Sequence, residues 1–77
     1  MNSVASILLR EFCSYDRAIA YASRIARSAA LNGNGEMANE YAEAASEMAE
    51  MRDDRRAYWF KRLNDSDAEA AAQRIGA

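Results

Sequence analysis

Apolar residues recur along the chain every three or four positions, which is the spacing of one face of an α-helix. A strict alternation of apolar and polar residues, which would indicate a β-strand, is missing, and β-branched residues are few. Proline is absent, and the only glycines are Gly33, Gly35 and Gly76. The sequence therefore predicts an all-α protein with long helices.

The strongest interruption of this pattern is the tetrapeptide Asn32-Gly33-Asn34-Gly35. Asparagine and glycine tolerate the left-handed backbone that ends a helix and turns the chain. We expect a helix over residues 3–31, a turn over residues 32–35 and a second helix over residues 36–63.

A weaker interruption lies at Asn64-Asp65-Ser66. Ser66 and Glu69 have the S-x-x-E spacing of a capping box, which marks a helix start. The sequence thus predicts a short third helix over residues 67–75. With 77 residues in all, we expect a single helical domain over residues 1–77.

Alanine follows a regular pattern in both long predicted helices. Spacings of three, four and three positions on the first helix, and of four, three and four on the second, are those of the inward-facing residues of a coiled coil. If the chain reverses at Asn34, the two rows meet in antiparallel order, and their small side chains let the helix axes approach to about 8 Å. The sequence predicts an antiparallel αα-hairpin whose seam consists of Ile19, Ala22, Ala26 and Ala29 with Ala38, Ala42, Ala45 and Ala49.

Larger apolar residues lie one position before the seam, on one side of the hairpin, where a monomer leaves them uncovered. An alanine-rich chain this short gains little stability from one core, so a second subunit is the expected extra source. We expect a homodimer that forms a helical bundle. Its interface, or that with another protein, is predicted to contain Tyr21, Ile25, Met37, Tyr41, Met48, Met51, Tyr58 and Trp59, with Ala18 and Ala44 between them.

The segment RRAYWFKR, residues 55–62, combines three adjacent aromatic rings with flanking basic residues. Neighbouring helix positions point about 100° apart, so one helix contact cannot bury all three rings. In the predicted hairpin, Trp59 or Phe60 packs on Leu8 and Phe12, and the third helix covers another ring through Ala68, Ala71 and Ile75. A structural mini-core, a protein-binding hot spot and a stacking surface for single-stranded nucleic acid all remain open.

Basic residues form a second candidate surface. Arginine recurs every seven residues on the first predicted helix, giving a ridge that can contact phosphates, be solvated or pair with glutamates of a second copy. The net charge of −2 gives no general attraction to nucleic acid. The alternative nucleic-acid contacts are Arg10, Arg17 and Arg24 on the ridge, with Arg55, Arg56, Lys61 and Arg62.

Acidic residues form a stripe along one helix, at Glu36, Glu40, Glu43, Glu47 and Glu50. Carboxylates at this spacing could suggest a metal site, but all of them lie along a single helix that faces water. We therefore interpret the stripe as a solvated face and expect no metal.

Catalytic chemistry has few candidates in this composition. Histidine is absent and Cys13 is the only cysteine, so the common zinc sites, an internal disulfide and a nucleophile–base pair have no residues to form them. We expect neither enzyme activity nor a cofactor.

The compartment is predicted from the same features. A lone cysteine is typical of a reducing environment. The apolar run Val4–Leu9 is too short for a signal peptide, and no segment approaches the roughly 20 apolar residues that span a membrane. We expect a cytoplasmic protein without a membrane partner.

These patterns favour a small non-enzymatic regulatory or inhibitory protein that binds a protein target through an apolar helical face. The alternative is a nucleic-acid-associated protein that uses the basic residues named above. A third hypothesis is a structural subunit of a larger assembly, such as that of a phage.

Overall fold

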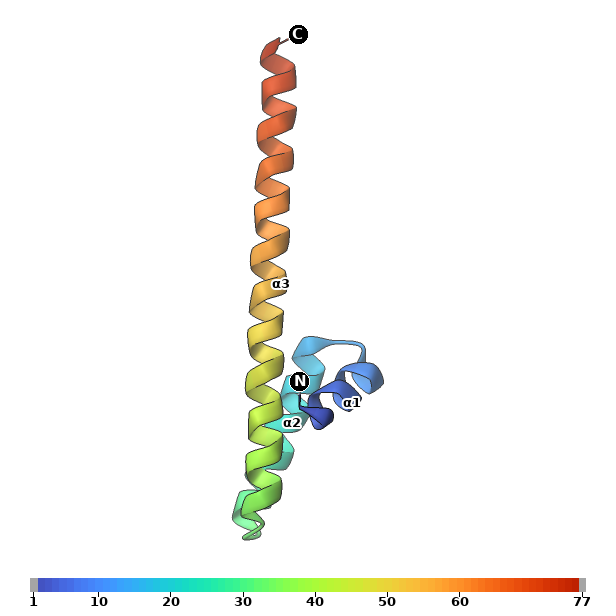
Figure 1. Ribbon diagram of the computed structural model, residues 1–77, viewed down its shortest axis with the longest axis vertical. Helices are drawn as coiled ribbons and strands as arrows, with labels where there is room; N and C mark the ends of the chain where they lie inside the picture. Colours follow the sequence, from blue (N-terminus) through green and yellow to red (C-terminus); the bar gives the residue numbers. More distant parts are fainter. Residues whose placement is uncertain (1, 77) are drawn as a thin grey trace.

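The structure is a computed structural model that describes the backbone of residues 2–76 and the side chains of residues 2–65. It contains three α-helices: α1 (Ser3–Phe12), α2 (Tyr15–Leu31) and α3 (Gly35–Gly76) (Figure 1). Within the described backbone there is no β-strand. The predicted all-α class is confirmed.

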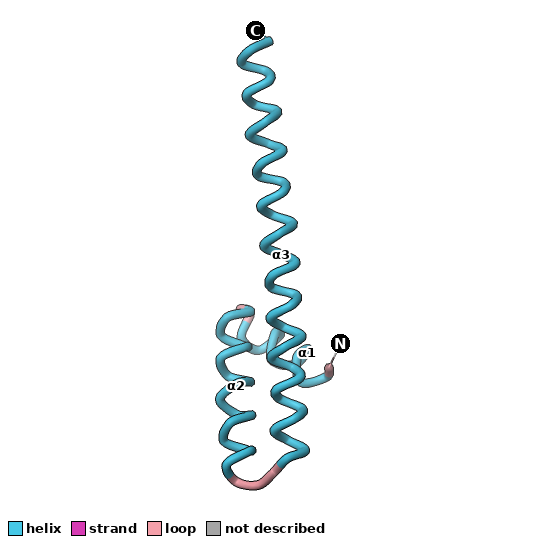
Figure 2. The backbone as a smooth tube through the Cα atoms, turned by 90° about the vertical axis from the view of Figure 1, so that its left-hand side faces the viewer, coloured by secondary structure: helices cyan, strands magenta, loops and turns pink. Residues whose placement is uncertain are grey.

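The molecule is a rod of 66 × 18 × 17 Å whose length is that of α3. α2 lies beside the first half of α3 and runs in the opposite direction, and α1 packs against α2 and this first half of α3 (Figure 2). The second half of α3 extends alone beyond this three-helix body (Figures 1 and 2).

The turn between α2 and α3 forms where the Asn-Gly repeat predicts it. Gly33 has a φ of +77°, and the N–H groups of Gly33 and Asn34 donate to the carbonyls of Ala30 and Ala29 at 3.2 and 2.8 Å. This is the hydrogen-bond pattern of a Schellman motif, which ends a helix and turns the chain. The Asn34 side chain then accepts from the N–H of Met37 at 3.2 Å and caps α3.

The expected continuous helix over residues 3–31 is wrong, because the chain bends sharply at an elbow formed by Cys13 and Ser14. Cys13 has a left-handed backbone, with φ 52° and ψ 28°, which ends α1. The Ser14 hydroxyl accepts from the N–H of Arg17 at 3.3 Å and starts α2 as its N-cap. The elbow lets α1 turn back against the other two helices.

The elbow makes a specific prediction about Cys13. A left-handed backbone costs a non-glycine residue about 1–2 kcal/mol, so Cys13→Gly is expected to be neutral or to stabilise the fold by up to about 1 kcal/mol. Cys13→Val adds a β-branched side chain at the same φ and is expected to destabilise it. Urea denaturation of the three proteins measures the difference, and a Gly variant less stable than the Val variant would contradict the assignment.

The core forms where α1 closes over α2 and α3. It consists of Ala5, Leu8, Ala18, Ala22, Ala44 and Met48, all nearly or fully buried. The α1 N-terminus is held by Asn2, whose N–H donates to a Glu47 carboxylate oxygen at 2.7 Å and whose side-chain amide donates to the Glu40 carbonyl at 3.2 Å.

This core corrects the predicted seam on α3. Ala42 is exposed, and the other three predicted seam positions of this helix are only half-buried. Ala44 and Met48, which the sequence places on an uncovered flank, are instead 0% exposed. The reason is that α1 occupies that flank, so the expected gap is closed within the same chain.

The predicted break at residues 64–66 is also wrong, because α3 continues through it as one helix. Asparagine, aspartate and serine favour helix starts but do not stop a helix as proline does. The predicted contacts of Ala68, Ala71 and Ile75 lie outside the described side chains. The consequence is a straight helix that carries the aromatic segment away from the body.

Candidate functional site: the unsupported half of α3

We call residues 53–76 of α3 the shaft. The contact between α2 and α3 ends where α2 begins, opposite Arg52. Every described side chain beyond this point, from residue 53 to residue 65, is exposed. In proteins, most helical stability comes from packing an apolar face, and the exposed side chains of residues 53–65 have no such packing.

Large hydrophobic side chains gather on the shaft close to its base. The exposed fractions are 50% for Tyr58, 53% for Trp59, 67% for Phe60 and 58% for Leu63. Four such residues within six positions form an apolar patch that no described part of the chain covers. The expected packing of this segment on Phe12 does not form, because α1 turns away at the elbow and Phe12 packs on Tyr21 with ring centroids 5.2 Å apart.

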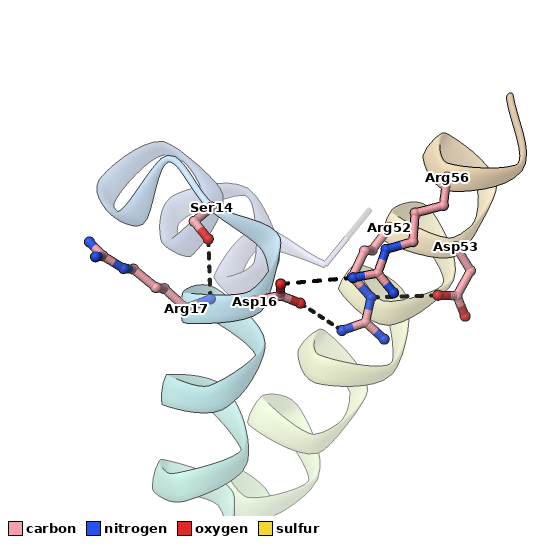
Figure 3. Close-up of polar contacts among 6 residues, drawn as sticks. All are labelled: Ser14, Asp16, Arg17, Arg52, Asp53 and Arg56. Carbon is pink, nitrogen blue, oxygen red and sulfur yellow. Dashed lines mark hydrogen bonds and ion pairs between the residues drawn. The ribbon is translucent and has the colours of Figure 1, made fainter. Parts of the chain in front are cut away.

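The base of the shaft is tied to the N-terminus of α2 by a small charged cluster (Figure 3). Asp16 accepts a hydrogen bond from Arg52 at 2.9 Å, and its other oxygen lies 3.9 Å from Arg56. Asp53 lies 3.5 Å from the Arg52 Nε. The hydrogen bond that Arg52 donates to Asp16 raises the pKa of Arg52 above its ordinary value, although partial burial of the guanidinium opposes this.

Within the patch, neighbouring side chains hold one another in place. Arg62 donates to the Tyr58 hydroxyl at 3.0 Å, with its guanidinium 5.7 Å from the ring centroid. Tyr58 also meets Trp59 edge to face at 5.6 Å. These contacts lie along one helix, at spacings of four and one.

Two open hollows flank Trp59. The first has a volume of about 350 Å³ and lies above the start of α2, between Ser14, Tyr15 and Asp16 and the α3 residues Arg52, Arg55, Arg56, Trp59, Phe60 and Leu63. The second has a volume of about 760 Å³ and is lined by Tyr15, Met51, Asp54, Arg55, Tyr58, Trp59 and Arg62. Both combine aromatic walls with arginines, so they suit apolar side chains that have acidic neighbours.

The residues predicted to form an interface lie in different parts of the structure and differ in exposure. Tyr58 and Trp59 lie on the shaft and are exposed. Met48 has no exposed surface, so it offers nothing to a partner. Met37 is exposed at the turn, whereas the others are half-buried in the body, at Tyr21, Ile25, Tyr41 and Met51.

Two members of the patch, Phe60 and Leu63, are missing from the predicted interface. The sequence assigns Phe60 to a contact with a first helix that runs alongside it. The sequence did contain a signal against this contact, because Ser14 as an N-cap and Asp16 in the first turn mark the start of a new helix. With a new helix starting there, no first helix continues alongside Phe60.

The basic residues do not form one ridge. Arg10 is on α1, whereas Arg17 and Arg24 are on α2, beyond the elbow. Arg24 lies 5.6 Å from the Tyr21 ring centroid. On the shaft, Arg55, Arg56, Lys61 and Arg62 are exposed, as expected for the alternative nucleic-acid contacts.

The acidic stripe lies on the open side of α3. Glu43, Glu47 and Glu50 line a shallow hollow there, and Glu47 holds Asn2. Among the described residues, no group of three or more histidine, cysteine, aspartate or glutamate side chains is placed to hold a metal ion. Cys13 is exposed, and its thiol lies 3.5 Å from the Arg10 carbonyl.

In the described part of the chain, no helix has an apolar stretch sufficient to cross a membrane. Comparison of the chain with protein-family models, curated proteins and solved structures gives no match.

Proposed function

We propose that this chain is a small non-enzymatic regulatory or inhibitory protein that acts by binding another polypeptide through its shaft. The observation that carries the proposal is the uncovered patch of Tyr58, Trp59, Phe60 and Leu63 on a helix without intramolecular support. Exposed apolar groups gathered in this way mark interaction surfaces. A cytoplasmic location, favoured by the single cysteine, is part of the same proposal.

The composition of the patch favours a protein partner. Tryptophan, tyrosine and arginine are the residues that most often dominate protein interfaces, and here they lie side by side. Aspartates border the patch on both sides, at Asp53, Asp54 and Asp65, and these would repel phosphates. An apolar helix that docks against a groove or against another helix is a common mode of peptide recognition.

The two halves of the molecule have separate tasks in this proposal. The body, in which α1 covers Ala44 and Met48, holds the first half of α3 in place. The cluster of Asp16, Arg52 and Arg56 fixes the point at which the shaft leaves it. A partner thus meets a helix whose direction is already set, which lowers the entropy lost on binding.

A photo-crosslinking amino acid in place of Phe60 tests the proposal, because it keeps an aromatic ring at the centre of the patch. In cells that make this chain, we expect a covalent adduct with a polypeptide. The same substitution at Ile7, which is 57% exposed on α1, is the matched control and should give little or no adduct.

The patch must also be necessary for the adduct. Adding Leu63→Asp to the Phe60 crosslinker chain is expected to reduce its yield at least fivefold. Equal adducts from positions 7 and 60, or an adduct that survives Leu63→Asp, would contradict the proposal. An adduct with nucleic acid would instead support the alternative function.

A further inference from the structure

We infer that the shaft of one chain packs antiparallel against the shaft of a second copy. This inference rests on the proposed function and names its polypeptide partner. It begins from the hollow above α2, which is bounded below by Ser14, Tyr15 and Asp16 and along its side by α3. A helix that continues the path of α2 would fill this hollow.

The spacing of residues on the shaft suits such a helix. Arg52, Arg56, Trp59 and Leu63 all line the hollow, and their separations of four, three and four are those of a coiled-coil seam. Continued along the sequence, the same seam reaches Ser66, Ala70 and Gln73. The shaft is about 36 Å long at 1.5 Å per residue, enough for roughly three heptads.

The position of α2 selects the antiparallel orientation. α2 already lies on this side of α3 below Arg52. In a parallel pair, the first half of the second copy's α3 would have to pass through the space that α2 occupies. An antiparallel copy approaches from the free end of the shaft, and the end of its α3 reaches the elbow without meeting α2.

Side-chain size also favours the antiparallel pair. When the two seams run in opposite directions, Trp59 lies opposite Ala70 of the second copy, and Leu63 lies opposite its Ser66. These two layers each join a large residue to a small one. In a parallel pair, two copies of Trp59 would share one layer and two copies of Arg56 another, which adds crowding and repulsion between like charges.

The charges bordering the seam are complementary in this register. Arg62 and Glu69 of the second copy have neighbouring register positions, as do Asp53 and its Arg74. Twofold symmetry repeats each pairing of opposite charges. Such pairs at the edges of a helical seam set partner choice and orientation.

Trp59 is the only tryptophan and reports directly on the pairing. With increasing concentration of the full chain, we expect sedimentation to show a monomer–dimer equilibrium. The tryptophan emission should shift to shorter wavelength over the same range, because the half-exposed ring becomes covered. A chain that remains monomeric, with Trp59 accessible to a collisional quencher, would overturn the inference and leave the crosslinking test of function unaffected.

Orientation is measured with spin labels on full chains carrying Cys13→Ser and one new cysteine. The two labels at Asn64 are expected to lie close together, on either side of a single helix contact with about 10 Å between the two helix axes. Labels at Asp53 are expected about 35 Å apart along the axis, because each faces the far end of the other shaft. Short separations at both positions would show a parallel pair and overturn the inference.

Charge reversal provides an independent check. Arg62→Glu is expected to raise the dissociation constant of the dimer at least tenfold, and adding Glu69→Arg to the same chain should largely restore it. Adding Asp67→Arg instead is the matched control, since residue 67 would face Arg62 only in a parallel pair. Restoration of the dimer by Asp67→Arg but not by Glu69→Arg would refute the antiparallel pair. Crosslinking of the Phe60 variant only to a different protein would refute self-pairing.

Discussion

Replacing Met48 by alanine is expected to destabilise the body by about 2–5 kcal/mol, the usual cost of truncating a fully buried methionine. Met48 has no exposed surface and belongs to the cluster formed by all three helices. A domain of this size rarely has more than about 3–5 kcal/mol in reserve. The variant should therefore be largely unfolded in the body, which urea denaturation followed by far-UV circular dichroism measures.

The matched control is Met37→Ala, which makes the same change on the same helix at a residue that remains partly exposed at the turn. Its effect should stay within about 0.5 kcal/mol, as for most surface substitutions. The decrease in the free energy of unfolding caused by Met48→Ala should be the same at all protein concentrations, because α1 rather than a second chain covers this side chain. A loss that depends on concentration would contradict the assigned core.

Enlarging Ala22 to leucine is expected to destabilise the body by about 1–3 kcal/mol, because a packed interior must shift to accept extra methylene groups. Ala22 is 0% exposed and lies in the cluster with Ala5 and Ala44. Small residues from three helices meet there, so there is little room for a longer side chain. Chemical denaturation gives the magnitude.

Ala20→Leu provides the comparison on the same helix, because Ala20 is exposed. Alanine and leucine are both strong helix formers, so the two variants differ mainly in the surroundings of the new side chain. Ala20→Leu should change the free energy of unfolding by less than about 0.5 kcal/mol. Similar losses for both variants would mean that Ala22 does not lie at a close helix contact.

Local signals in the sequence were sufficient for part of this fold. Helix-forming residues and the lack of proline predict the all-α class. Asn32 to Gly35 predicts the turn, because these residues accept the backbone angles that the Schellman motif requires. Such features depend on a few adjacent residues, so they are readable without knowledge of distant contacts.

The elbow was harder to predict because its left-handed residue is a cysteine rather than a glycine. Only the N-cap at Ser14 and the acid at Asp16 mark the new helix, and both also occur inside helices. Once α1 turns back, it changes which side of the other helices is buried. One missed bend therefore changed the expected surroundings of residues as distant as Met48 and Trp59.

The alanine content explains the error in the seam. Ala42, Ala44, Ala45 and Ala49 surround much of α3, so several of its faces are equally suited to a close contact. The choice of Ala44 depends on where α1 lies, and no local pattern encodes that position. Tyr58 and Trp59 could be identified as candidate site residues because adjacent aromatic rings cannot all be buried by one neighbour.

A single uninterrupted helix connects the body to the patch, so the direction in which each ring points is set by residue count alone. Seven residues separate Arg52, which pairs with Asp16, from Trp59, and seven residues are close to two full turns. Trp59 therefore faces the same way as the charged cluster. Inserting one residue between them would rotate the whole patch by about 100°, while leaving the composition of both parts unchanged. In this protein, the rotational phase of one helix therefore sets the direction in which the aromatic patch faces.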